Sequence, residues 1–306
     1  MRIVFHGQQA FGEAVLQRLI DRGEDIVAVC TAPDKEGRPL DPVKQLALDK
    51  GLAVHQPASW KNDAALELMQ SFEADVCVMA YVLLFIPQAV LDAPRLGSFQ
   101  YHPSLLPMHR GPSSINWPIA MGSTRTGLSI FWPDEGLDEG PILMQKECDI
   151  GPDETLADIY FKKLFPMGVD AMIESLDLVK SGDAPKRLQN LDEGSYESWF
   201  GKTQAKIDWG QPGAETYNKI RAGNPQPGAW TTLAGDVVQI FDSRLLAQDG
   251  GDVGEILAID ANGITVSAGD GNAVLISRVR AEGEGKIAAA EFASTHGLKP
   301  GDKFGN

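Results

Sequence analysis

Residues 1–30 read MRIVFHGQQAFGEAVLQRLIDRGEDIVAVC, and this stretch decides the fold class. Apolar and β-branched residues predict strands over 2–5 and 25–30. Between them Phe11, Val15 and Leu19 recur at the three-to-four-residue spacing of one helix face. A strand, a helix and a second strand in this order are typical of a parallel sheet with crossover helices. The glycines after the first strand lack the G-x-G-x-x-G spacing of a dinucleotide site.

The same alternation continues toward the middle of the chain. A continuous apolar strand such as 75–80 fits a sheet that helices cover on both faces. We therefore predict a Rossmann-like, doubly wound α/β domain with a parallel sheet. Its further strands are expected at 52–55, 97–101, 127–132 and 142–149, and its further helices at 43–50, 64–72 and 155–180.

The pattern changes after Gly182. Residues 182–204 are polar and glycine-rich, as a linker or strap would be. Short β-like runs bounded by Gly-Asp and Asn-Gly turns follow, with one helix near 214–221. They are expected at 237–241, 254–259, 263–267 and 273–279. We predict two domains, an α/β domain over 1–203 and a smaller, β-barrel-like domain over 204–306.

Composition excludes several classes of protein. The chain has 306 residues, and 27 Lys and Arg against 42 Asp and Glu give a net charge of −15. Such a charge disfavours general binding to nucleic acid or to anionic lipid. No apolar run approaches the roughly 20 residues of a membrane-spanning helix, and the N-terminus lacks the features of a signal peptide. Three scattered cysteines indicate neither a disulfide framework nor a zinc site, so a cytoplasmic, metal-free protein is expected.

Two segments carry candidate chemistry. QYHPSLLP (100–107) places His102 where a strand ends, the edge at which open α/β sheets bind ligands. Pro103 and Pro107 restrict the loop that follows. The second segment, DEGLDEG (134–140), is a tight acidic turn whose carboxylate could orient the histidine. Each segment alone is also compatible with a surface loop.

Together the two segments resemble the folate-dependent formyltransferase family. The resemblance rests on YHPSLLPMHRG (101–111) and GLDEG (136–140). Further matching segments, in the family's order, are TAPDK (31–35), PVKQLA (42–47) and IDW (207–209). Within the family the chain looks most like the members that hydrolyse 10-formyltetrahydrofolate. It is also similar to those that formylate methionyl-tRNA.

The resemblance implies a site and a reaction. 10-Formyltetrahydrofolate would be the formyl donor, with no metal required. His102 matches the family histidine that contacts the developing oxyanion, and Asp138 matches the carboxylate that pairs with it. Gln100 stands where transferases usually carry Asn, one methylene further from the formyl oxygen. Pro141 also departs from the family pattern, which more often has Asp there.

The folate is expected to lie along the carboxyl ends of the strands, because an apolar wall with a few polar groups suits a pterin ring. The loop after His102 adds Ser104 and Arg110, the latter facing an anionic acceptor or capping a carbonyl. The residues expected to form the wall are Met79, Ala80, Tyr81, Leu84, Phe85 and Ile86.

The acceptor of the formyl group is left open by the motifs. The loop 33–40 is short and mixed in charge, and residues 205–306 hold 9 Lys or Arg against 13 Asp or Glu. Since phosphate contacts dominate affinity for RNA, we rank tRNA below water as acceptor. A small amine or amino sugar is a further alternative. A catalytically idle folate-binding protein is the hypothesis of a different class.

Overall fold

The computed structural model describes residues 1–248 and 250–305. The chain divides into two compact units, each of which draws on three stretches of sequence. The first unit comprises residues 1–111, 127–148 and 163–196, and the second comprises 112–126, 149–162 and 197–306. The domain boundary expected between residues 203 and 204 stays a prediction.

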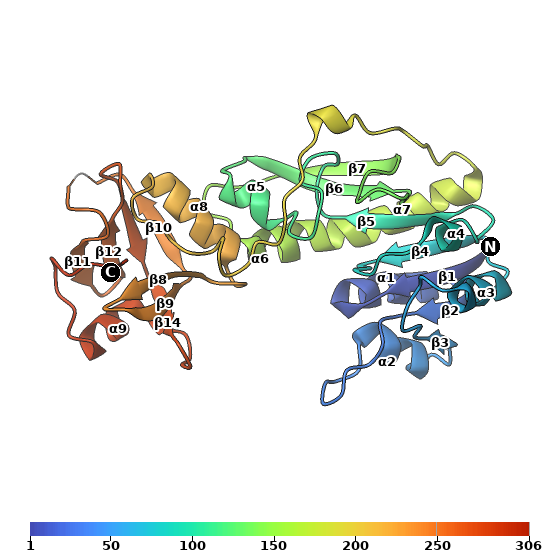
Figure 1. The fold of residues 1–306 in the computed structure, drawn as a ribbon, viewed down its shortest axis with the longest axis horizontal. Coiled ribbons are helices and arrows are strands. Elements are labelled where there is room, and N and C mark those ends of the chain that lie inside the picture. The colour runs from blue at the N-terminus through green and yellow to red at the C-terminus, as the bar shows by residue number, and fades with distance from the viewer. Residues whose placement is uncertain (249, 306) are drawn as a thin grey trace. The chain divides into compact units, whose positions relative to one another are not determined.

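A seven-stranded sheet forms the centre of the first unit (Figure 1). Its order is β3-β2-β1-β4-β5-β6-β7. Strands β2 and β3 are added on one side of β1 and β4 to β7 on the other, so the direction of strand addition reverses between β1 and β4. β1 to β5 pair in parallel, whereas β6 runs antiparallel to β5. The predicted parallel α/β sheet is thus confirmed for its central part. The strands are β1 (Arg2–Gly7), β2 (Asp25–Cys30), β3 (Val54–His55), β4 (Val76–Ala80), β5 (Ser98–His102), β6 (Arg125–Phe131) and β7 (Ile142–Asp149).

Helices pack on both faces of this sheet. Phe11 of α1 stacks on Tyr101 of β5 and meets Phe165 of α7 edge-on, which builds one apolar layer. On the other face Met69 of α3 and Val90 of α4 share a buried cluster with residues of β1, β2 and β4. The helices of this unit are α1 (Gln9–Asp21), α2 (Pro42–Asp49), α3 (Asp63–Ser71), α4 (Gln88–Leu91) and α7 (Phe165–Ser181).

The long helix expected over 155–180 is interrupted. A short α6 (Leu156–Ile159) leads into a π-helical turn, η1 (Tyr160–Leu164), before α7 begins. Pro166 lies in the first turn of α7 and has no backbone N–H, so regular hydrogen bonding cannot continue through it. The helix ends at Ser181 and is capped by Gly182, whose φ of 82° suits glycine.

The second unit contains two four-stranded sheets, with orders β10-β13-β12-β11 and β15-β14-β9-β8. Neighbouring strands in both sheets pair antiparallel. The strands are β8 (Ala229–Leu233), β9 (Asp236–Ile240), β10 (Ser243–Leu246), β11 (Ile256–Asp260), β12 (Gly263–Ser267), β13 (Ala273–Ile276), β14 (Arg278–Ala281) and β15 (Ile287–Ala288). The α-helices are α5 (Asn116–Ala120), α6 (Leu156–Ile159), α8 (Gly213–Gly223) and α9 (Ala289–Thr295).

Two expectations for this unit need correction. The run 273–279 is two strands, because the chain passes from one sheet to the other at Ser277, whose N–H donates to the carbonyl of Asp242. The sequence predicted a single helix in this part of the chain, near 214–221, and the structure adds a second one, α9. α9 spans only seven residues, too few for a periodic signal, and forms because Phe292 and Ala293 are buried in the core between the strands.

Candidate active site

His102 is the last residue of β5, at the carboxyl edge of the parallel strands. Its side chain is only 7% exposed. Because strand side chains alternate, Gln100 and His102 project from the same face of the sheet. Gln100 pairs with Met79 of β4, which belongs to the cluster under α3 and α4. The predicted Gln100 and His102 therefore share the α3–α4 side of the sheet edge.

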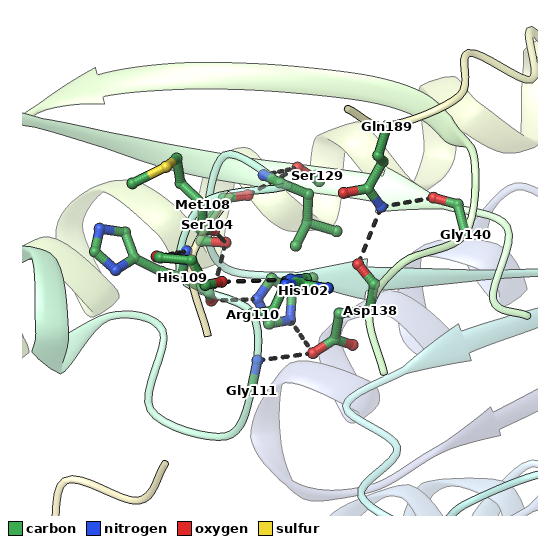
Figure 2. A network of polar contacts seen from close by, with 12 residues as sticks. His102, Ser104, Met108, His109, Arg110, Gly111, Ser129, Asp138, Gly140 and Gln189 are labelled. Carbon is green, nitrogen blue, oxygen red and sulfur yellow. Dashed lines mark hydrogen bonds and ion pairs between the residues drawn. The ribbon is translucent and has the colours of Figure 1, made fainter. Parts of the chain in front are cut away.

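The imidazole of His102 has two different neighbours (Figure 2). Nε2 lies 3.0 Å from the carbonyl oxygen of His109, which can only accept a hydrogen bond, so this nitrogen carries a proton when the bond forms. Nδ1 lies 3.6 Å from Oδ2 of Asp138, longer than an ordinary hydrogen bond. The loop thus occupies Nε2, and Nδ1 is the atom that faces the carboxylate.

Asp138 is held by the acidic turn in an unusual backbone conformation. Its φ is +57°, and its Oδ2 accepts a hydrogen bond of 2.9 Å from the backbone N–H of Gly111. A Cβ on Gly140 would lie 1.8 Å from the carbonyl oxygen of Trp132, so only glycine fits two residues later. The turn is tight because its chain passes directly against the end of β6.

The loop after His102 is tied together by hydroxyl groups. Ser104 is fully buried, and its Oγ donates to the carbonyl of Met108 at 2.6 Å. Ser129 of β6 donates to the carbonyl of Ser104 at 2.8 Å and accepts from the N–H of Leu106 at 3.0 Å. The Ser104 hydroxyl is therefore used within the loop, where it fixes the backbone that carries the carbonyl of His109.

Arg110 joins this loop to the acidic turn. Its guanidinium forms an ion pair with Glu139, the neighbour of Asp138. Its backbone N–H donates to the carbonyl of Ser195 at 3.0 Å. The Arg110 side chain therefore has a carboxylate partner within the chain. The sequence analysis expected it to face an anionic acceptor or to cap a carbonyl, and did not include an ion pair with Glu139.

The end of β4 and the segment after it divide into buried and exposed residues. Met79, Ala80 and Ile86 are buried in the core. Tyr81, Leu84 and Phe85 are 39%, 44% and 55% exposed, so they can contact a ligand directly. A flat apolar ligand would therefore contact the three exposed side chains, and the three buried residues would lie beneath them in the core.

Positive φ angles concentrate around this edge. Of the six non-glycine residues with positive φ in the described chain, Gln9 follows β1 and Tyr81 follows β4. His109 lies in the loop after β5, and Asp138 lies in the acidic turn. Left-handed backbone at non-glycine residues is costly and gathers at functional sites. The distribution marks the carboxyl ends of β1, β4 and β5 independently of any motif.

Other titratable groups near the sheet are fixed in neutral forms. Burial lowers the pKa of His6 to about 4, and the ring packs against Trp60. Burial also raises the pKa of the Cys77 thiol to about 12 and that of Cys30 further still. These thiols are protonated at neutral pH and are poor nucleophiles.

Two other kinds of site are absent from residues 1–248 and 250–305. Those residues include no group of three or more His, Cys, Asp and Glu side chains arranged to hold a metal ion. Among the helices that the structure describes, none is long and apolar enough to cross a bilayer.

Two residues of this edge escaped the sequence analysis. Gln189 and Ser195 come from the polar stretch that reads as a linker. Gln189 donates to the turn that carries Asp138 (Figure 2), and Ser195 accepts from the N–H of His109 in the loop after His102. No local pattern marks them, because a glutamine or serine in a glycine-rich stretch is typical of solvated loops.

Comparison with known proteins gives the family. Residues 1–176 match the formyl transferase family, and residues 200–297 match the formyl transferase C-terminal domain. The chain belongs to the formyl transferase family.

Individual relatives cover different shares of their own length. The chain is 36% identical over 307 residues to the mitochondrial 10-formyltetrahydrofolate dehydrogenase of Mus musculus, covering 96% of this chain and 33% of that protein. It thus spans about a third of the dehydrogenases that it matches. It is 35% identical to the methionyl-tRNA formyltransferase of Trichlorobacter lovleyi, with 98% of this chain and 96% of that protein covered.

Solved structures share the fold at low sequence identity. HypX from Aquifex aeolicus, in complex with tetrahydrofolic acid, superposes with a TM-score of 0.67 at 22% identity, covering 96% of this chain and 47% of that one. WlaRD, a sugar 3N-formyl transferase, superposes with a TM-score of 0.69 at 18% identity, covering 93% and 98%.

Proposed function

We propose that this protein hydrolyses 10-formyltetrahydrofolate to tetrahydrofolate and formate, with His102 and Asp138 as its catalytic residues. The observation that carries the proposal is the separation of 3.6 Å between Nδ1 of His102 and Oδ2 of Asp138 at the carboxyl edge of the sheet. A closed hydrogen bond would engage both atoms with each other. The open separation leaves both able to bond to a third group that lies beside them.

The formyl donor has a suitable wall beside this pair. The pterin ring is planar and largely apolar on its faces, and Tyr81, Leu84 and Phe85 are the exposed apolar side chains that follow β4. Met79 lies beside Gln100 in the sheet, so the wall begins one strand away from the catalytic pair. The donor would therefore lie across β4 and β5 with its formyl group toward His102.

The residues have distinct parts in the reaction. The Asp138 carboxylate takes a proton from water as the water oxygen bonds to the formyl carbon. Because Nε2–H of His102 is held by the carbonyl of His109, Nδ1 can donate only when the imidazole carries both protons. In that imidazolium form Nδ1–H donates to the formyl oxygen, where negative charge develops. The bond between the formyl carbon and N10 then breaks, and the transferred proton ends on N10. Formic acid leaves and loses its remaining proton to solvent, so that tetrahydrofolate and formate are the products.

We prefer water as the acceptor because of the side chain at Gln100 and the burial of Asp138. Gln100 lies two residues before His102 on the same face of β5, where its amide can reach the formyl oxygen. Its longer side chain places that amide differently from the Asn usual in transferases. The Asp138 side chain is 11% exposed, which suits a small acceptor such as water better than a bulky one.

One observation favours a second candidate, formyl transfer to methionyl-tRNA. In the second unit, two cations lie over one partly exposed aromatic ring despite the acidic composition of the chain. The ammonium groups of Lys202 and Lys206 lie over Trp230. Such side chains suit contacts with single-stranded nucleic acid. The methionyl-tRNA formyltransferase relative also matches over nearly its full length.

The test separates the acceptors by product. The purified chain is incubated with 10-formyltetrahydrofolate alone, with methionyl-tRNA, and with small amines and amino sugars, while tetrahydrofolate and formate are measured. We expect equal amounts of both products with no added acceptor. Tetrahydrofolate release that depends on an amine, without formate, would replace hydrolysis by transfer. Saturable folate binding without any product would identify an idle binder.

A further inference from the structure

Gln189 makes two hydrogen bonds to the turn that carries Asp138 (Figure 2). Its Nε2 donates to the carbonyl oxygen of Asp138 at 3.0 Å and to that of Gly140 at 2.6 Å. The two carbonyls flank Glu139, so one amide fixes the turn on both sides of its tip. Both of these hydrogen bonds go to backbone carbonyls, not to the imidazole of His102 or the carboxylate of Asp138.

The segment 187–196, here called the strap, also holds the loop after His102. Ser195 accepts from the N–H of His109 at its Oγ, at 2.9 Å, and from the N–H of Arg110 at its carbonyl, at 3.0 Å. Its own N–H donates to the carbonyl of Pro107 at 3.2 Å. Ser195 thus fixes the backbone whose His109 carbonyl accepts from Nε2 of His102.

The strap is anchored to the sheet independently of these contacts. Arg187 exchanges backbone hydrogen bonds of 2.8 and 3.0 Å with Ile142 of β7. A Cβ on Gly194 would lie 2.6 Å from the carbonyl oxygen of Pro107, so the strap runs directly against the loop. The strap is therefore held to β7 at Arg187, and from there it contacts both the loop after His102 and the turn that carries Asp138.

We propose that the strap sets the separation of His102 and Asp138, with Gln189 as the positioning residue for Asp138. The inference rests on the proposed function. Asp138 needs such support because its φ of +57° is disfavoured, and a relaxed turn would carry its carboxylate away from Nδ1. A displacement of about 1 Å can lower a rate by about 10²-fold.

Packing alone does not account for a glutamine at this position. Its Oε1 is buried and has no hydrogen-bond partner, which is unfavourable. Methionine would fill nearly the same volume without that buried oxygen. What glutamine adds is the pair of N–H donors directed at the two carbonyls. Its value therefore lies in the geometry of the turn.

The first test replaces Gln189 by methionine in the full chain. We expect Gln189→Met to lower kcat for formate release by at least about tenfold while KM for 10-formyltetrahydrofolate stays within about twofold. Gln17→Met is the matched control, because Gln17 makes one hydrogen bond to Asp21 on helix α1 of the same unit. Circular dichroism and Tm of both variants show whether each is folded.

A second variant, Gln189→Glu, tests the donors by pH. The introduced carboxyl group keeps one donor when it is protonated, whereas its ionised form would repel both carbonyls. We expect kcat of this variant, relative to wild type, to rise as the pH falls through the range in which the introduced group gains its proton. Gln189→Met should show no such rise. The titratable and charged groups on the elements around this position lie in the loop that starts at His102, in the acidic turn and in the strap. They are His102, His109, Arg110, Asp134, Glu135, Asp138, Glu139, Arg187, Asp192, Glu193 and Tyr196.

The outcomes separate the inference from the proposed function. Active wild type together with unchanged kcat in Gln189→Met overturns the inference alone. Parallel pH profiles for Gln189→Glu and wild type also overturn it, and this measurement decides if Gln189→Met does not fold. A wild-type chain that releases no product with water or any amine overturns the proposed function instead.

Discussion

Replacing Gly140 by alanine tests whether the shape of the acidic turn controls the rate. An added Cβ would lie 1.8 Å from the carbonyl oxygen of Trp132, whereas ordinary contact begins at 3.4 Å. The two backbones must therefore separate by the difference, about 1.6 Å. The N–H of Trp132 also donates to the carbonyl of Pro141 at 2.9 Å, so the turn cannot move away without straining that bond.

The movement reaches the catalytic pair through two residues of chain. Asp138 lies two positions before Gly140, and Gln189 binds the carbonyls of both. A shift of this size at Gly140 is expected to change the 3.6 Å separation of Nδ1 and Oδ2 by an amount on the order of 1 Å. We therefore expect kcat to fall by about 10²-fold and the overpacked turn to cost about 1–3 kcal/mol of stability.

The assay follows formate and tetrahydrofolate release at saturating 10-formyltetrahydrofolate, with urea unfolding in parallel. Gly285→Ala is the control, because a Cβ at Gly285 meets nothing within 4 Å. It should leave kcat within about twofold of wild type. A folded Gly140→Ala protein with wild-type kcat would refute the argument that turn geometry limits the reaction.

Further predictions concern the catalytic pair, Gln100 and the buried His6. His102→Ala and Asp138→Ala should each lower turnover by at least about 10²-fold with tetrahydrofolate binding retained in calorimetry, since a positioned acid or base contributes about 10²–10⁴; weakened binding at unchanged kcat would contradict their role. Gln100→Asn should slow formate release by about tenfold, equal to about 1.4 kcal/mol. An unchanged rate would show that residue 100 does not influence the choice of water as acceptor. Burial lowers the pKa of His6 from 6.5 to about 4. Between these two pH values the unfolded chain therefore binds a proton on His6 that the folded chain does not bind. Stability should therefore be full above about pH 6.5 and fall as the pH drops toward 4, and His6→Gln should flatten this dependence in urea unfolding.

The first unit was predictable because its periodicities are strong. Strand 25–30 has the predicted bounds, and the apolar strand before Tyr81 differs by one residue. His102 was expected at a strand end and lies there. Periodicity could not show that β6 runs antiparallel to β5, because alternation along a strand carries no information about the direction of its neighbour.

The sequence by itself determined the α/β alternation, the β-rich second part and the two motifs around His102 and Asp138. Each of these depends on residues close together in the chain, where spacing alone carries the signal. The tertiary structure alone decided which nitrogen of His102 faces Asp138, and which wall residues are exposed. It also decided that Gln189 and Ser195 support both loops, since contacts between segments more than 50 residues apart along the chain leave no trace in local composition.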